Sequence, residues 1–309
     1  MNLSAHEEMV QAIVRTHGNL KLPTPPGLNF VDLIGEPVHR AAKQACLALG
    51  FIEIDAQFVA AAWQSKFDRA GRFDAHAWPD DPVDFGLAPW PRENAFETCP
   101  KQLGLYAVLP DASWVGRMAH AGVPTVQLRF KSDDPEAIRR ETVAAVDAVR
   151  GTSALLFIND HWQAAIDAGA YGVHLGQEDM QAANLTTIRD AGLRLGLSSH
   201  GYAEMVKADA FSPSYIAMGA VYATTLKRMV TPPQGPERLH VYARLMRNYP
   251  LVGIGGIDES NINDVLTSGI GSVAVVRSLV TAIQPETQAA LLMRKIAAAQ
   301  NGASSQKAG

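Results

Sequence analysis

Residues 154–179 read ALLFINDHWQAAIDAGAYGVHLGQED, and this stretch carries the pattern that indicates the fold. Two short apolar runs, 154–159 and 172–176, flank an amphipathic segment at 162–168. Both runs are mostly apolar rather than alternating, as expected for parallel strands that are covered on both faces. The stretch therefore predicts a strand, a helix and a second strand that is parallel to the first.

The same alternation of strands and helices extends in both directions from this stretch. The expected strands are Leu103–Leu109, Thr125–Phe130, Ala154–Asn159, Gly172–Gly176, Arg194–Ser198, Tyr215–Val221, Leu251–Gly255 and Ser272–Val276. The clearest amphipathic segments between them are Asp134–Val149, Trp162–Ala168, Ala183–Ala191 and Ser260–Ser268. Eight such units predict an α/β fold, a (β/α)8 TIM barrel in residues 101–309. An open doubly wound sheet would need a glycine-rich nucleotide motif after the first strand, where this chain has Leu109-Pro110-Asp111.

Residues 1–100 have a different pattern and are predicted to form a mostly helical extension. A capping box, Ser4-Ala-His-Glu7, starts the first expected helix. The expected helices are 5–18, 36–49 and 55–67. Between Trp78 and Pro91 the chain is dense in proline and tryptophan, so we expect an ordered linker without regular structure, with its tryptophans packed on a neighbour.

Composition limits the classes of partner. The chain has 309 residues, of which 47% are hydrophobic and 19% charged, which is typical of a globular protein. Its net charge of -4 gives no general attraction to nucleic acid or to anionic membranes, so a phosphorylated ligand must be held by local cations. Cys46 and Cys99 lack metal-ligand spacing and are expected to be inert thiols. With no signal-peptide or membrane-span pattern, a cytoplasmic location is expected. A homo-oligomer is compatible with the sequence.

Polar side chains at the carboxyl end of the second strand indicate a phosphate site. Gln127, Arg129 and Lys131 alternate along the chain and share one face. That face would point into the mouth of the barrel, where barrel enzymes have their active sites. Arginine offers a planar fork to phosphate oxygens, and lysine adds a compact charge. A solvated, charged strand end is the alternative interpretation.

Acidic residues follow the next two strands. Asn159-Asp160 ends a wholly apolar strand, and Asp179 ends the loop after the fourth strand. Two carboxylates from adjacent loops suit Mg²⁺, which completes its shell with water and substrate phosphate. Each Asp could instead cap a helix or turn, so this interpretation depends on the pair and on the cationic strand beside it.

Further polar residues follow the later strands. His174 lies inside an apolar strand and is interpreted first as a satisfied core residue. Ser198 could bond a ligand, although no partner acid supports a nucleophile. Residues 223–227 bring hydroxyl groups and a lysine over the mouth, and residues 231–235 are interpreted as a mobile lid segment. The glycine-rich turn 253–257 and the turn after the eighth strand predict a second phosphate site.

Together these motifs resemble the thiamine phosphate synthase (thiamine-phosphate pyrophosphorylase) family over about residues 104–282. The runs that carry the resemblance are Gln127–Lys131, Phe157–Asp160, Tyr171–Asp179, Gly196–His200, Ile254–Ile257 and Ser272–Val276. The resemblance implies a transferase that condenses hydroxymethylpyrimidine diphosphate with hydroxyethylthiazole phosphate, or its carboxylated form. Pyrophosphate would leave first, with Mg²⁺ as cofactor, and the thiazole nitrogen would then capture the pyrimidine-methyl cation.

The resemblance also implies a role for each matching residue. The pyrimidine diphosphate would be held by Gln127, Arg129, Lys131, Asn159 and Lys227, with Ser198 contacting the pyrimidine or the diphosphate. Asp160 and Asp179 would bind Mg²⁺. The thiazole phosphate would be held by Thr224, Gly256, Val276 and Arg277.

The chain departs from the family pattern near the thiazole phosphate. A Pro-Thr-x-Thr-Lys loop is replaced by Ala223-Thr-Thr-Leu-Lys227, so that Thr225 would have to supply the second hydroxyl. Arg277 stands where the family has serine. The alternatives are a thiazole tautomerase, which needs no diphosphate site, and a non-catalytic sensor of thiamine precursors. Because the extension is extra to the usual barrel, deletion of residues 1–100 is expected to leave a soluble, active barrel.

Overall fold

Parallel strands close into a barrel in the order β1 to β8, each hydrogen-bonded to the next and β8 to β1. The structure is a computed structural model that describes residues 4–23, 35–89, 92–224 and 231–307. Its strands are β1 (Gly104–Leu109), β2 (Thr125–Leu128), β3 (Leu155–Asn159), β4 (Gly172–Leu175), β5 (Arg194–Ser199), β6 (Tyr215–Met218), β7 (Leu251–Ile254) and β8 (Ser272–Val275). The predicted TIM barrel is confirmed.

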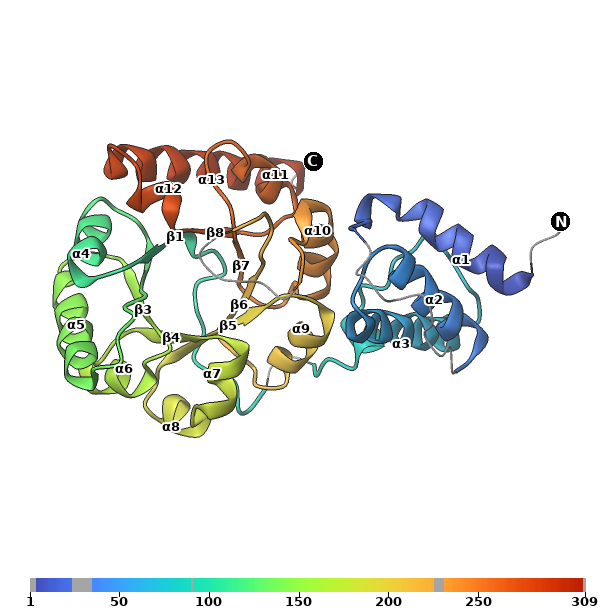
Figure 1. Cartoon of the computed structure of the whole chain (residues 1–309), viewed down its shortest axis with the longest axis horizontal. Helices are drawn as coiled ribbons and strands as arrows, with labels where there is room; N and C mark the ends of the chain where they lie inside the picture. The colour runs from blue at the N-terminus through green and yellow to red at the C-terminus, as the bar shows by residue number, and fades with distance from the viewer. Residues whose placement is uncertain (1–3, 24–34, 90–91, 225–230, 308–309) are drawn as a thin grey trace.

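Helices surround the barrel (Figure 1). They are α4 (Ala112–His120), α5 (Pro135–Ala148), α6 (Trp162–Ala168), α7 (Gln177–Ala182), α8 (Leu185–Asp190), α9 (Tyr202–Asp209), α10 (Gly235–Leu245), α11 (Ile262–Thr267), α12 (Arg277–Val280) and α13 (Pro285–Lys307). The last of these lies against α11, α12 and β1. In the described ranges, none of the helices combines the length and apolar content that a bilayer crossing requires.

Alternation along the strands separates two buried layers. In β1, Leu105 packs with the residues under the helices, whereas Tyr106 joins a cluster inside the barrel with Phe157 and Tyr215. Glycines make room for these rings: a Cβ on Gly196 would lie 2.1 Å from Tyr215 Cζ. The barrel interior is thus a packed core below the mouth, as is usual for this fold.

The N-terminal region, residues 4–100 where described, consists of three α-helices and two 3-10 turns. They are α1 (Ala5–Thr16), η1 (Gly18–Leu20), α2 (Pro37–Ala48), α3 (Glu53–Ala70) and η2 (Pro82–Phe85). Figure 1 shows these helices at one side of the barrel, next to α9 and α10. The predicted capping box is present, with Glu7 N donating to Ser4 Oγ over 3.3 Å and Ser4 N to Glu7 Oε2 over 2.7 Å.

Several predicted elements differ in their bounds or type. The proline-rich linker contains the 3-10 turn η2, which the sequence analysis excluded; Pro82 is tolerated there because the first N–H of a helix needs no partner. Trp78 is buried against the N-terminal helices and the barrel, while Trp90 and Pro91 lie outside the described residues. Strand β2 ends at Leu128 rather than Phe130, and the residues that follow it, Arg129 and Lys131, line the mouth of the barrel.

Candidate active site

One cavity of about 800 Å³ opens at the carboxyl ends of the strands. This size is ample for small-molecule ligands. Of the residues that the sequence predicted as site residues, those that line the cavity are Gln127, Arg129, Lys131, Asn159, Asp160, Asp179, Ser198, Thr224, Gly256, Val276 and Arg277. Thr225 and Lys227 lie outside the described residues. The expectation that residues from distant strands gather around one pocket is therefore met by every described member.

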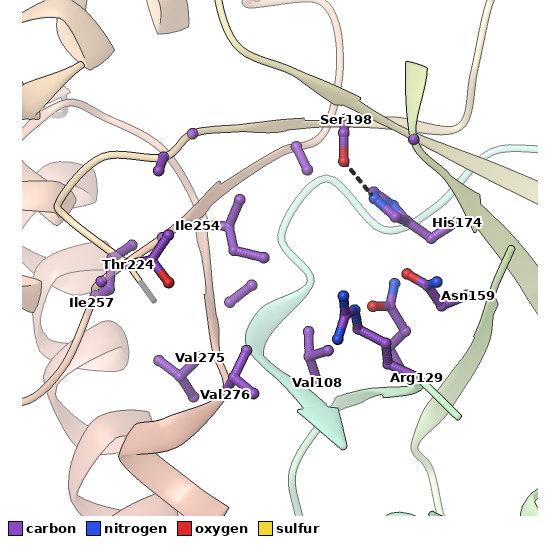
Figure 2. Close-up of a pocket in the computed structure, with 18 of the residues that line it drawn as sticks. Val108, Arg129, Asn159, His174, Ser198, Thr224, Ile254, Ile257, Val275 and Val276 are labelled. Carbon is purple, nitrogen blue, oxygen red and sulfur yellow. Dashed lines mark hydrogen bonds between the residues drawn. The ribbon is translucent and has the colours of Figure 1, made fainter. Parts of the chain in front are cut away.

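One wall of the cavity, which we call its β2–β4 side, consists of polar residues at the ends of β2 and β3 and in α7. They are Arg129, Lys131, Asn159, Asp160 and Asp179. Arg129 and Asn159 point into the same space in Figure 2. Lys131 Nζ lies 2.6 Å from Asp160 Oδ2. Although Arg129 and Lys131 follow the end of β2, the Arg129 N–H still donates to Leu109 O over 2.7 Å, which holds the segment beside the barrel.

Asp160 occupies a backbone conformation that few side chains adopt. Its φ angle is +64°, in the left-handed region where aspartate is tolerated better than most residues. Its N–H donates to His174 O over 3.0 Å, and its carbonyl accepts from Trp162 N over 2.8 Å. The turn between β3 and α6 is thus fixed at both sides of the residue, and strain of this kind is typical of functional sites.

Asp179 lies next to Asp160 in this side of the cavity. It belongs to the first turn of α7, a helix that the sequence analysis interpreted as a loop; acidic residues in a first turn favour a helix start, and this signal could have been used. The pKa of Asp179 is raised above its usual value, first by burial and then by the Asp160 carboxylate, with which it shares a hydrogen bond. Among the described residues, no group of three His, Cys, Asp or Glu side chains is arranged to hold a metal.

A chain of hydrogen bonds crosses the barrel beneath the cavity. Gln127 Nε2 lies 3.1 Å from the hydroxyl of Tyr106, which lies 2.7 Å from the hydroxyl of Tyr215. His174 Nδ1 lies 2.7 Å from that second hydroxyl, and its Nε2 lies 2.8 Å from Ser198 Oγ (Figure 2). The chain therefore links two predicted ligand contacts, Gln127 and Ser198.

The donors in this chain can be assigned. The Gln127 amide nitrogen only donates, so the hydrogen of Tyr106 must go to Tyr215, since a buried hydroxyl needs an acceptor. Tyr215 then donates to Nδ1 of a neutral His174, and Nε2–H of His174 donates to Ser198. Burial raises the pKa of both phenols, which keeps them protonated and able to donate. As a result, the Gln127 carbonyl oxygen and the Ser198 hydroxyl hydrogen remain for a ligand.

His174 is the main residue whose role the sequence analysis underestimated. It is a satisfied, buried side chain, as expected, but it also lines the cavity and bonds Ser198. One signal was present in the sequence: in β4 and β5, His174 and Ser198 are each two residues after a glycine that faces the barrel interior.

The opposite wall, which we call the β6–β8 side, consists of Thr224, Gly256, Val276 and Arg277 with apolar neighbours. In Figure 2 the labelled residues Thr224, Ile254 and Val276 lie across the cavity from Arg129. Gly256 has φ +65°, and a Cβ there would lie 2.6 Å from Ala223 O. Only glycine therefore lets the turns after β6 and β7 approach so closely. Arg277 begins α12 and lines the cavity.

The interpretation of residues 231–235 as a mobile lid segment is wrong for its last two residues. Gln234 is buried, and its N–H donates to Ala220 O over 2.8 Å, while Gly235 begins α10. The Gln234 side chain accepts hydrogen bonds from Arg238 and Tyr242. The end of the β6–α10 connection that leads into α10 is therefore fixed to the barrel.

Comparisons with known proteins agree with this geometry. Residues 105–279, from β1 into α12, match the family described as thiamine monophosphate synthase. The thiamine-phosphate synthase of Neisseria gonorrhoeae is 52% identical over 184 residues, which are 60% of this chain and 90% of that protein. The enzyme of the same name from Yersinia pestis is 43% identical over 201 residues, 65% of this chain and 94% of the relative.

Solved structures agree in fold. Thiamine phosphate pyrophosphorylase from Pyrococcus furiosus superposes with a TM-score of 0.56 at 23% identity, covering 64% of this chain and 96% of that one. At this identity the likeness shows the barrel alone. The names of the curated relatives favour a synthase over the tautomerase and the sensor that the sequence left open. The family match spans more than half of the chain, so this protein belongs to the thiamine monophosphate synthase family and is a transferase that acts on small phosphorylated substrates.

Proposed function

We propose that this enzyme joins hydroxymethylpyrimidine diphosphate to hydroxyethylthiazole phosphate, giving thiamine phosphate and pyrophosphate in a dissociative reaction assisted by Mg²⁺. The observation that carries the proposal is the division of one cavity into two unlike walls. Its β2–β4 side combines cationic side chains with a pair of carboxylates, and its β6–β8 side combines glycine turns with one arginine. Two different phosphorylated substrates need two such walls.

The diphosphate fits the β2–β4 side. Arg129 and Lys131 supply a fork of N–H donors and a compact charge to its oxygens. Asn159 adds an amide at the end of β3. Lys227 would add a third cation by its family motif, from outside the described residues.

The aminopyrimidine ring fits between Gln127 and Ser198. Such a ring presents an amino group, which donates, beside ring nitrogens, which accept. The hydrogen-bond chain leaves a carbonyl acceptor on Gln127 and a hydroxyl donor on Ser198. This acceptor and donor are complementary to the ring, which supports a pyrimidine rather than a second phosphate at this depth.

The donor set of Asp160 and Asp179 suits Mg²⁺. Two carboxylates close enough to share a hydrogen bond repel each other when both are ionised, and a divalent ion between them removes that repulsion. Hard oxygen ligands, with substrate phosphate completing the shell, are typical of Mg²⁺ sites. When bound there, Mg²⁺ would act as a Lewis acid toward the leaving diphosphate.

The thiazole phosphate fits the β6–β8 side. The turns after β7 and β8 commonly bind phosphate through backbone N–H groups in TIM barrels. Arg277, at the start of α12, adds a cation that the usual family serine lacks. Thr224 lines the same wall.

The reaction needs no protein nucleophile. The bond from the pyrimidine methylene carbon to the diphosphate oxygen breaks, and its electron pair leaves with the diphosphate. The lone pair of the thiazole nitrogen then forms the new bond to the same carbon. Arg129 and Lys131 stabilise negative charge as it develops on the leaving oxygens, which is electrostatic catalysis.

Pyrophosphate release tests the proposal, measured with both substrates in the presence and absence of Mg²⁺. Asp160→Asn is the informative variant, because asparagine tolerates the left-handed backbone and keeps the shape of the side chain. We expect turnover to fall by about 10²–10³-fold, comparable to the loss of a key electrostatic group. Asp133→Asn, an exposed neighbour outside the cavity, is the control and should match the wild type. Near-normal turnover in Asp160→Asn would rule out the metal assignment.

A further inference from the structure

Helix α9 directly follows the active-site end of β5, and side chains of the N-terminal region hold it at both ends. The last residue of β5, Ser199, and the first residue of the turn before α9, His200, line the cavity together with Ser198. Family similarity begins only at residue 105, so the groups that hold this helix are additions to the barrel.

Asp55, in the first turn of α3, caps the N-terminus of α9. Its Oδ1 accepts from Ala203 N over 2.9 Å, and the side chain is 4% exposed. The helix has Gly201 at its own N-cap position, with no side chain to serve as a cap. A Cβ on Gly201 would lie 2.0 Å from Asp55 Oδ2. The glycine therefore makes room for a carboxylate that comes from another part of the chain.

Arg92 binds the C-terminus of the same helix. Its Nη2 lies 2.7 Å from the carboxylate of Asp209, the last residue of α9, and its Nη1 donates to Asp209 O. A cation at a helix C-terminus and an anion at its N-terminus both stabilise the helix dipole. The N-terminal region thus places an anionic group at one end of α9 and a cationic group at the other, in addition to Glu204 and Lys207 of the helix itself.

Aromatic packing adds to the contact at the start of α9. Tyr202, at the start of α9, is fully buried, and its hydroxyl accepts from Trp78 Nε1 over 2.8 Å. Phe85 stacks on Tyr202 with ring centroids 5.2 Å apart. This packing fixes the position of α9 as well as its ends.

Arg238 makes a second attachment, behind the β6–α10 connection. It donates to Leu20 O over 3.0 Å and to Leu49 O over 2.9 Å, both in the N-terminal region. Its third contact is Gln234 Oε1 at 3.0 Å, and Gln234 in turn bonds Ala220 at the cavity wall. The attachment therefore continues from the N-terminal region to a second wall of the site.

We propose that the N-terminal region is a positioning part of the active site, which holds the β5–α9 turn beside Ser198, the residue that contacts the pyrimidine in the proposed function. The proposal rests on the proposed function for the identity of that ligand. Asp55 and Arg92 are positioning residues in it, since neither lines the cavity.

The test compares Asp55→Ala and Asp55→Asn in the full chain with Glu53→Ala as the control. Glu53 is a carboxylate in the same helical turn, but it pairs with Lys43 inside the N-terminal region. In Asp55→Ala we expect KM for the pyrimidine diphosphate to rise about fivefold to tenfold, the size of a lost cap. KM for the thiazole phosphate should stay within about twofold. A smaller folded fraction would lower kcat without moving either KM.

Hydrogen exchange gives a readout that needs no turnover. The amides of residues 202–206 should exchange faster in Asp55→Ala, less so in Asp55→Asn, which keeps one acceptor oxygen, and unchanged in Glu53→Ala. If the amides of residues 202–206 exchange at the wild-type rate in Asp55→Ala, or if exchange rises evenly over the whole barrel, the proposal is overturned. If Asp55→Ala does not fold, the same comparison on Asp55→Asn decides. Local exchange that responds while the wild type releases no pyrophosphate would refute the proposed function and leave the attachment standing.

Discussion

At the scale of single residues, the direction of the hydrogen bonds between Gln127 and Ser198 determines what the cavity can recognise. The three inner members, Tyr106, Tyr215 and His174, are neutral groups, and each has one donor that is already committed to the next member. If the hydrogen bonds of the chain ran in the opposite direction, the Tyr106 hydroxyl hydrogen would be buried without an acceptor, which costs about 1–3 kcal/mol. The cavity therefore presents an acceptor at one wall and a donor at the other.

Tyr215→Phe tests this assignment. The change removes the hydroxyl that joins Tyr106 to His174, so His174 can switch tautomer and take the Ser198 hydrogen. We expect KM for the pyrimidine diphosphate to rise about tenfold, which corresponds to one unsatisfied buried group. Tyr171→Phe is the matched control, because the Tyr171 hydroxyl bonds Cys99 rather than a member of the chain. Equal kinetics for the two variants would contradict the assignment.

Asp55 predicts a pH dependence of stability. Burial, aided by the nearby Glu204 carboxylate, raises its pKa to about 6, against the opposing effects of Arg238 and the N–H groups of Ala203 and Tyr202. Between about pH 4 and pH 6 the folded state binds more protons at this group than the unfolded state does, so its contribution to the free energy of unfolding falls as pH rises.

Asp55→Asn removes this titration. We expect the stability of the variant relative to the wild type to increase between pH 4.5 and pH 7.5 by about 2 kcal/mol. Urea unfolding of both proteins at the two pH values measures the difference. A difference that stays constant, or that changes in favour of the wild type, would show that Asp55 does not carry a raised pKa.

At the scale of elements, a glycine on one strand of the barrel interior lies against a large aromatic side chain on the neighbouring strand. Gly196 in β5 leaves the space that the Tyr215 ring of β6 fills, and Gly172 in β4 does the same for Phe157 of β3. The Tyr215 hydroxyl can reach His174 because position 196 lacks a side chain.

Gly196→Ala should disrupt that match. Its methyl group would overlap the Tyr215 ring, and overpacking of this kind costs about 1–3 kcal/mol or more. Urea denaturation should show a lower midpoint than in the wild type. Gly18→Ala is the control, since no other residue lies within 4 Å of the added carbon. An unchanged midpoint in Gly196→Ala would mean that the interior is loosely packed.

Sequence patterns predict the elements better than their contacts. Strands and cavity residues follow from local features: apolar runs, and polar side chains at their carboxyl ends. The bond from Asp55 to Ala203 joins residues 148 positions apart, and that from Arg92 to Asp209 spans 117. No periodicity records such pairs, so the sequence analysis treated the N-terminal region as separable. Helix α7 was missed for a different reason, since Gly176 and the acidic residues after it also suit a loop.

At the scale of the whole molecule, the N-terminal region and the barrel share a buried interface. Tyr202 and Arg238 are 0% and 2% exposed because the N-terminal region covers them. Removal of residues 1–100 would expose an aromatic ring and leave a buried arginine without two of its acceptors. The interface therefore predicts a different outcome from the soluble, active barrel that the sequence suggests.

Truncation to residues 101–309 should lower the melting temperature by at least about 5 °C, since a loss of 1 kcal/mol shifts a domain of this size by about 2–4 °C. Differential scanning calorimetry of the two proteins measures the change. The control is the full chain carrying Glu53→Ala, which alters the surface of the N-terminal region and leaves the interface intact. A truncated protein that melts at the same temperature would show that the contacts add no stability.

The most direct test of the two-walled cavity is a crystal structure with thiamine phosphate, pyrophosphate and Mg²⁺ bound. We predict pyrophosphate within hydrogen-bond distance of Arg129 and Lys131, with the metal between Asp160 and Asp179. The phosphate of thiamine phosphate should lie at Gly256 and Arg277. Pyrophosphate on the β6–β8 side, or either product outside the cavity, would contradict the account.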